Sequence, residues 1–87
     1  MTLSFPNQSR SFDATRSAVR FWGHDSAMEA SFFVNDAALR RLTPNMGSDE
    51  DSLLSVFDLN RKLIYAIAAK VYGRGRKGSY DLLAADF

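Results

Sequence analysis

The feature that most constrains this sequence is one long segment with apolar residues at helical spacing. Between Ser48 and Gly73 they recur at intervals of three and four residues, the pattern of one apolar helix face. This stripe consists of Leu53, Val56, Phe57, Leu63, Ile64, Ile67, Ala68 and Val71. Acidic residues 49–51 near the start and Lys70 near the end suit the helix dipole, and Gly73 is a typical stop. The segment therefore predicts a long helix that Ser48 opens and Gly73 ends.

The predicted helix is longer than the diameter of a compact domain of this size. A straight helix over Asp49–Tyr72 would be about 36 Å long. A compact domain of 87 residues is only about 30 Å across. We therefore expect the helix to bend, to start late or to project beyond the body, in which case it would need a partner. Its weakest helix-forming stretch is Asp58–Asn60, and Asp58 itself lies opposite the apolar stripe, in solvent.

The first half of the sequence has the composition and turn residues of β-strands. An early strand is predicted at about Ser9–Asp13, and two more at Ser17–Trp22 and Ala27–Val34. Gly23–Ser26 between them has turn composition. A reversal centred on this turn gives antiparallel pairing with apolar residues on one face of the hairpin and polar residues on the other.

The register of this hairpin is predicted from its side-chain pairs. A reversal about residues 24 and 25 places Phe21 opposite Met28 on the core face. The same register places Arg20 opposite Glu29 on the outer face, as an opposite-charge pair.

A short helix and a last strand complete the prediction. Asn35 caps a helix from Asp36 to about Leu42, and Pro44 ends it. Ser79–Ala84 is the last strand. The order β-β-β-α-α-β predicts an α+β, two-layer fold over residues 1–87 as a single domain. Its antiparallel sheet of about four strands carries one short and one long helix on one face.

Composition excludes several classes of site. The chain has no cysteine and one histidine, which excludes disulfides, thiolate chemistry and multi-histidine metal sites. The net charge is +1, which gives no global attraction to nucleic acid or acidic membranes. We expect no cofactor, no metal and no membrane span. Residues 1–6 lack the order of a signal peptide, which favours a cytoplasmic, bacterial-type protein.

No set of residues predicts catalysis. His24 and Asp25 are neighbours in a turn, and successive side chains point apart, so they do not form a base with its orienting carboxylate. The acidic cluster at residues 49–51 is explained by the start of a helix. We therefore predict no catalytic residue and a protein that is not an enzyme, with a small enzyme as the weakest alternative.

A basic glycine loop, Gly73–Gly78, spells G-x-G-x-x-G. The dinucleotide fingerprint needs a strand before it and a helix after it, and here the order is reversed, so we reject that function. Residues 61–77 nevertheless hold six basic and no acidic side chains, with three tyrosines, residues 65, 72 and 80, within or beside them. One hypothesis is therefore that Arg74, Arg76 and Lys77 contact nucleic acid or another anion while tyrosines stack on bases. The alternative is a solvated charged hairpin.

Two aromatic residues fall on the predicted outer face of the sheet, Trp22 and Phe33. Either the N-terminal segment covers them through Leu3 and Phe5, or they form a self-association surface. With the over-long helix, this favours a non-enzymatic protein-interaction or regulatory domain with an unknown protein partner or a second copy as a homodimer. The alternative is a nucleic-acid-binding module using the loop.

The chain also resembles a known family at positions along nearly its whole length. The matching features are Phe5, Phe12-Asp13, Ala18-Val19-x-Phe21, Phe32-Phe33-Val34, Ala38-Leu39, Phe57, Arg61, Ile64 and Ala68. In these the sequence is similar to the small bacterial family of unknown function 1488 (DUF1488). The resemblance implies a compact α+β fold in cytoplasmic proteins of proteobacteria. It implies no activity, cofactor or site residue, and the basic loop is not part of the family pattern.

Overall fold

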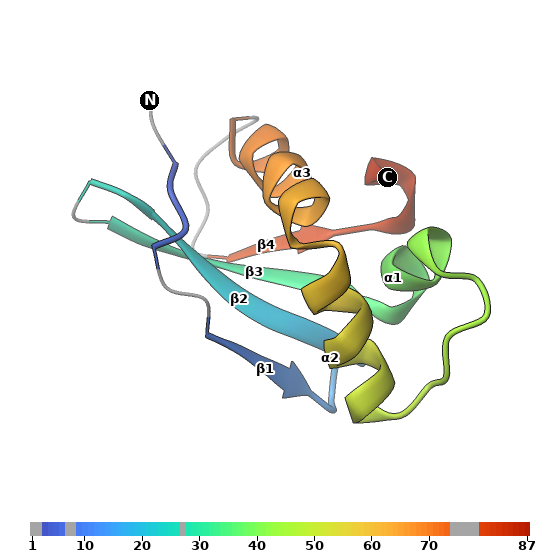
Figure 1. Cartoon of the computed structure of the whole chain (residues 1–87). Helices are drawn as coiled ribbons and strands as arrows, with labels where there is room; N and C mark the ends of the chain where they lie inside the picture. The colour runs from blue at the N-terminus through green and yellow to red at the C-terminus, as the bar shows by residue number, and fades with distance from the viewer. Residues whose placement is uncertain (1–2, 7–8, 27, 74–78) are drawn as a thin grey trace.

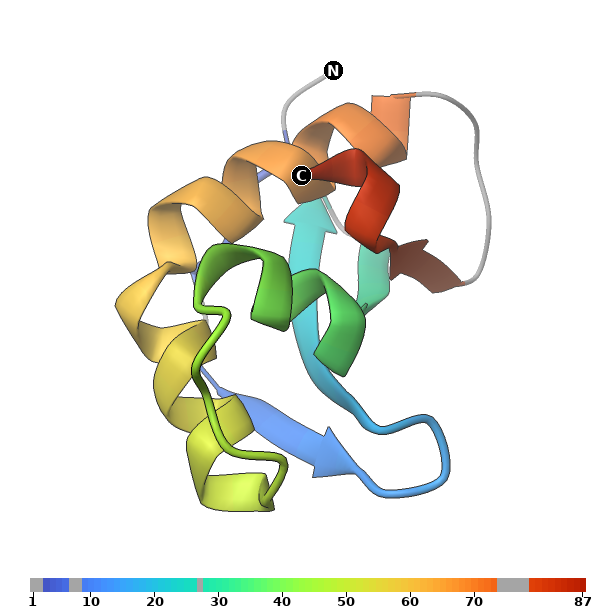
Figure 2. The same ribbon diagram turned by 90° about the vertical axis from the view of Figure 1, so that its right-hand side faces the viewer.

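All helices of the described chain lie on one face of a four-stranded sheet (Figures 1 and 2). The computed structural model describes residues 3–6, 9–26, 28–73 and 79–87. The strands are adjacent in chain order and comprise β1 (Arg10–Asp13), β2 (Ala18–Asp25), β3 (Met28–Asn35) and β4 (Ser79–Leu82). The helices are α1 (Asp36–Leu42), α2 (Glu50–Leu59) and α3 (Arg61–Gly73), with a short 3-10 turn at Ala84–Asp86. The predicted α+β class is confirmed.

The sheet is mixed, whereas the sequence had predicted antiparallel pairing. β1, β2 and β3 pair antiparallel, but β4 runs parallel to β3. The reason is the connection between them: three helices carry the chain from the end of β3 back to the start of β4, and a crossover of this kind joins parallel strands. The edge strand β4 is thus placed by the helical layer.

The long predicted helix is divided at Asn60, in the stretch where helix propensity is lowest, and the expected bend is confirmed. The amide of Asn60 donates to the carbonyl of Phe57 (3.1 Å) and its side-chain amide to the carbonyl of Val56 (2.9 Å). Its own carbonyl accepts from Ile64 (2.9 Å). One residue therefore ends α2 and begins α3 with backbone groups on both sides paired.

The helix caps follow the sequence closely. Asn35 caps α1 by accepting from the amide of Ala38 at 2.8 Å, as predicted. The cap of α2 is Asp49, one residue later than the predicted Ser48, and its carboxylate accepts from the amide and hydroxyl of Ser52. These hydrogen bonds lower the pKa of Asp49 below its ordinary value. The acidic cluster therefore belongs to the helix start.

The predicted hairpin register is wrong, although its faces are right. Phe21 lies opposite Phe32, and Arg20 lies opposite Phe33 instead of Glu29. The reversal falls after Asp25, and Ser26 has a φ of 56° there. Because the shift covers an even number of residues, each side chain keeps its predicted face. β2 is correspondingly longer than the sequence indicated.

The core lies between the sheet and the helices. Its largest fully buried side chains are Phe21, Phe32, Phe57, Leu39, Leu53, Ile64, Leu82, Val19 and Val34. Residues 3–6 extend this layer beside β2, where Ser4 and His24 exchange two backbone hydrogen bonds (2.8 and 2.7 Å). Phe5 stacks on Tyr65 with a centroid distance of 4.1 Å. The N-terminal segment thus joins the main core.

Gly23 provides the space for that segment. A Cβ at this position would lie 2.9 Å from Cε1 of Phe5 and 3.1 Å from Cδ1 of Leu3. Both distances are shorter than ordinary carbon contacts. The absence of a side chain at Gly23 is therefore what allows Phe5 to reach the core.

We expect Gly23→Val to destabilise the fold by about 1–3 kcal/mol, because Phe5 must leave its position or β2 must shift. Urea denaturation measures the free energy of unfolding. The matched control is His24→Val, which adds the same side chain to the adjacent, outer-face position and is expected to change stability by no more than about 0.5 kcal/mol. Equal effects of both substitutions would contradict the packing argument.

Candidate functional site

The two outward aromatic residues are covered by arginines of the same chain. The Arg16 guanidinium lies 4.1 Å from the ring centroid of Phe33, which is only 8% exposed. Arg20 lies between both rings, at 5.0 Å from Trp22 and 5.6 Å from Phe33, and donates to the hydroxyl of Ser31 at 3.2 Å. Of the two alternatives for this face, cover by Leu3 and Phe5 is wrong, because both pack against the main core, and arginines contact the two rings instead.

His24 and Asp25 point to opposite sides of the sheet, as predicted. Nε2 of His24 lies 3.7 Å from the carboxylate of Glu29 on the outer face. Asp25 accepts a hydrogen bond of 2.9 Å from the hydroxyl of Tyr72 on α3. The two side chains consequently have separate partners and do not form a catalytic pair.

The tyrosines proposed to stack on bases are part of the hydrophobic layer. Tyr72 and Tyr80 are buried, and Tyr65 stacks on Phe5. The basic residues of that hypothesis, Arg74, Arg76 and Lys77, lie outside the described residues. The structure therefore gives no support to the part of the nucleic-acid hypothesis in which tyrosines stack on bases.

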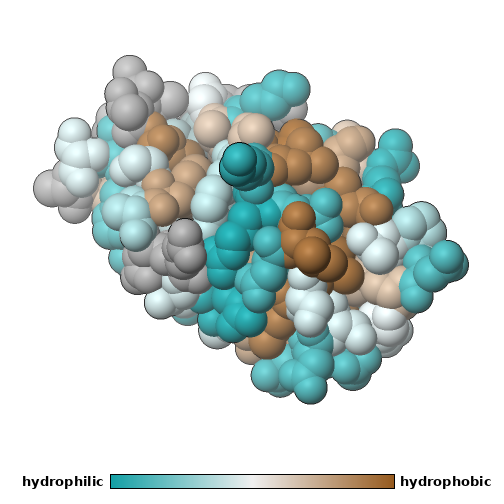
Figure 3. Space-filling view, viewed as in Figure 1, coloured by the Kyte–Doolittle hydropathy of each residue, from teal (hydrophilic) through white to brown (hydrophobic). Residues whose placement is uncertain are grey.

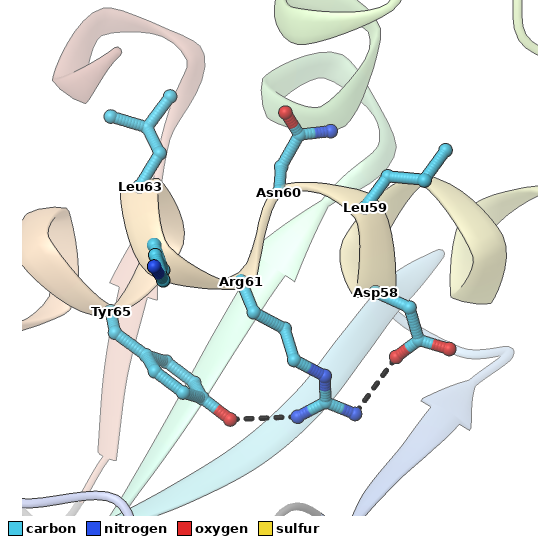
Figure 4. Close-up of a pocket in the computed structure, with 7 residues that line it drawn as sticks. Asp58, Leu59, Asn60, Arg61, Leu63 and Tyr65 are labelled. Carbon is cyan, nitrogen blue, oxygen red and sulfur yellow. Dashed lines mark hydrogen bonds and ion pairs between the residues drawn. The ribbon is translucent and has the colours of Figure 1, made fainter.

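A charged cluster joins the edge strand to the helix bend. Asp58 accepts two hydrogen bonds from Arg10 of β1, from Nε at 3.1 Å and from Nη2 at 2.9 Å. It also accepts from Nη2 of Arg61 at 2.8 Å. Arg61 donates through Nη1 to the hydroxyl of Tyr65 at 2.7 Å (Figure 4). Its guanidinium also lies 4.9 Å from the centroid of the Phe57 ring. Asp58 is exposed, as predicted, but its pairing with two arginines was not predicted.

The pairing of Arg10 with Asp58 shifts the pKa of both groups. Partial burial raises the pKa of Asp58, but the hydrogen bonds and positive charges of Arg10 and Arg61 outweigh burial and hold this pKa below its ordinary value. The hydrogen bond to Asp58 raises the pKa of Arg10. The Asp58 carboxylate and the Arg10 guanidinium are therefore charged at neutral pH.

The helix bend also leaves two leucines in solvent. Leu59 is 82% exposed and Leu63 is 45% exposed, although the sequence analysis had placed Leu63 in the buried stripe. After the bend Ile64, Ala68 and Tyr72 face the core, which turns Leu63 outward. In Figure 4 the leucines project to one side of the bend, and Asp58 and Arg61 to the other.

These residues line a surface hollow of about 570 Å³. We call this surface the junction patch; it consists of Arg10 and the lining residues Asp58, Leu59, Asn60, Arg61, Lys62, Leu63 and Tyr65. A second hollow of about 440 Å³ adjoins it between Ser9, Arg10, Asp58 and Arg61. Figure 3 shows hydrophobic side chains beside a hydrophilic band on this side of the molecule. The patch thus combines exposed apolar surface with fixed charge.

A metal site and a membrane span are both absent from the part of the chain that the structure describes. The described residues contain no group of three or more histidine, cysteine or acidic side chains that could hold a metal ion. No helix in this part of the chain has the length and apolar character needed to cross a membrane. The junction patch is therefore the strongest candidate site that the described residues provide.

Comparison with known proteins places this fold. A family model described as "Protein of unknown function (DUF1488)" matches residues 3–83. The chain belongs to the DUF1488 family. The resemblance noted in the sequence is thus confirmed. Because the family's function is unknown, membership assigns no role to the junction patch.

A solved structure shares the DUF1488 fold. It is the crystal structure of a protein of unknown function from the DUF1488 family of Shewanella loihica PV-4, with a TM-score of 0.81 and 21% identity over 94% of each chain. At that identity the similarity shows the fold alone. No curated protein matches the sequence.

We expect Asp58→Asn to destabilise the protein by about 1 kcal/mol at neutral pH, a value reduced for the exposure of the group. The folded-state pKa of Asp58 lies below its unfolded value, so its contribution is present above the unfolded value and is lost as pH falls through the folded one. The difference in the free energy of unfolding between the variant and the wild type should therefore become smaller below about pH 4. Denaturation at several pH values measures it, with Asp51→Asn in the first turn of α2 as control. A difference that is constant with pH would contradict the assignment.

Self-association through the outer face around Trp22 and Phe33 stays a prediction. Trp22 keeps part of its ring in solvent beside Arg20. If this face joins two copies, light scattering gives twice the chain mass and Trp22→Glu restores the single mass. A wild-type protein at the single mass at high concentration would contradict the homodimer.

Proposed function

We propose that this chain is a small, non-enzymatic protein-interaction domain that binds a partner chain through the junction patch. The observation that carries the proposal is the pair of exposed leucines, Leu59 and Leu63, beside a hollow at the helix bend. Isolated exposed leucines are common, but a neighbouring pair that lines a hollow beside ordered arginine side chains has the composition of a binding surface.

The packing beneath the patch supports its use as a rigid surface. Phe57 and Ile64, on either side of the bend, are fully buried, so the backbone that carries both leucines is held against the core. Asp58 and Arg61 are fixed by hydrogen bonds to Arg10 and Tyr65. A partner that binds here orders few of the patch's side chains, which lowers the entropic cost of association.

The leucines themselves supply the gain in free energy. Transfer of a leucine side chain from water to an apolar environment is favourable by roughly 1.5–3 kcal/mol when burial is complete. Because Leu59 is 82% exposed, its side chain contributes almost nothing to the stability of the fold. Its exposed area is therefore available to a partner, and its substitution leaves the core intact.

A photo-reactive amino acid in place of Leu59 tests the proposal in cells of the source organism. We expect ultraviolet irradiation to give a covalent adduct with another polypeptide, which mass spectrometry then identifies. The matched control carries the same group in place of Ala37, an exposed residue of α1. Adducts that are absent, or equal at both positions, would contradict an interaction through the junction patch.

A further inference from the structure

The junction patch has an excess of positive charge. The patch holds three basic side chains, Arg10, Arg61 and Lys62, and one carboxylate, Asp58, which pairs with the two arginines. Asp58 is shared by both arginines, so it balances one charge and leaves two in excess. The sequence adds no acidic residue between Leu59 and Tyr80. This part of the chain therefore supplies no carboxylate that could neutralise the excess positive charge.

The positive charge borders the same hollow as the exposed leucines. Arg61 is held by Asp58, by the hydroxyl of Tyr65 and by the face of the Phe57 ring. Lys62 lies in the same hollow, between Arg61 and Leu63 in the chain. A ligand that covers Leu59 and Leu63 consequently places its neighbouring side chains within the field of Arg61 and Lys62.

We propose that the partner segment at the junction patch is acidic and amphipathic, with apolar side chains that cover Leu59 and Leu63 and carboxylates that face Arg61 and Lys62. This inference rests on the proposed function and specifies the chemistry of the partner. Complementary charge favours such a segment through its rate of encounter and its selectivity, and it penalises basic segments.

The same charges disfavour a second copy at this surface. A symmetric contact between two junction patches centred on the leucines brings Lys62 and Arg61 near the same residues of the partner copy. Like charges then oppose each other at the centre of the interface. The patch therefore favours a chain of different chemistry, and the outer sheet face remains the predicted surface for self-association.

Fluorescence anisotropy with designed peptides tests the inference on the intact chain. The probe is a labelled peptide of roughly 12 residues with leucine at helical spacing and glutamate elsewhere. In matched peptides glutamine or lysine replaces every glutamate. We expect the glutamate peptide to bind at least about tenfold more tightly than the glutamine peptide, and less tightly as salt rises from about 0.05 M to about 0.5 M.

Two substitutions in the protein complete the test. Lys62→Glu and Leu59→Glu, both at exposed positions, should each weaken the glutamate peptide by about tenfold or more. The matched control is Lys70→Glu, the same charge change about 12 Å further along α3, beyond the screening length of about 8 Å. We expect a change of no more than about threefold there. Circular dichroism verifies that each variant is folded.

Several outcomes overturn the inference and leave the proposed function to be decided by the photo-cross-link. They are equal binding of the glutamate and glutamine peptides, binding of neither, and equal losses for Lys62→Glu and Lys70→Glu. Binding of a labelled single-stranded oligonucleotide that exceeds the glutamate peptide would assign the patch to nucleic acid instead. A Leu59 cross-link formed only with a second copy would overturn the acidic partner while supporting an interaction surface.

Discussion

The interruption of the long amphipathic helix at Asn60 is the constraint on which the rest of the structure depends. A continuous helix of this length would extend past the sheet, and its apolar stripe would lose contact with the core. The bend at Asn60 lets Phe57 on α2 and Ile64 on α3 both reach full burial. Because Asn60 supplies hydrogen-bond partners to Val56, Phe57 and Ile64, the change of direction leaves these backbone groups paired. Figure 2 shows the resulting arc of α2 and α3 over the sheet.

The candidate site is a consequence of the same bend. The change of direction sets Asp58 and Arg61 three residues apart on one side and the exposed leucines on the other. Arg10 then ties the end of α2 to the edge strand β1 through Asp58. A local interruption that the fold requires thus produces a surface with both apolar and charged groups. Rigid support by the core and hydrogen-bonded charges are properties that binding surfaces share.

Local signals in the sequence predicted much of this fold. The cap at Asn35 and the weak point at Asp58–Asn60 each depend on residues close together in the chain, and each is confirmed. The face on which each hairpin side chain lies was also predicted. Side chains alternate along a strand, so a shift of register by an even number of residues leaves each one on the same face. The register was predicted wrongly because it depends on where the chain reverses, which is after Asp25. The parallel direction of β4 was missed because it depends on how the helical layer connects β3 to the last strand.

The sequence by itself determined which segments are helical and which are extended, which side of the hairpin strands faces the core, and membership in a family of this fold. Only the tertiary structure decided the contents of the junction patch. The pair Arg10–Asp58 joins residues 48 positions apart, and no local pattern marks it. The exposure of Leu63 and the burial of Tyr72 and Tyr80 follow from the orientation of α3 after the bend. Periodicity assigns a residue to a face of its own element, but contacts between elements depend on the packing of all of them at once.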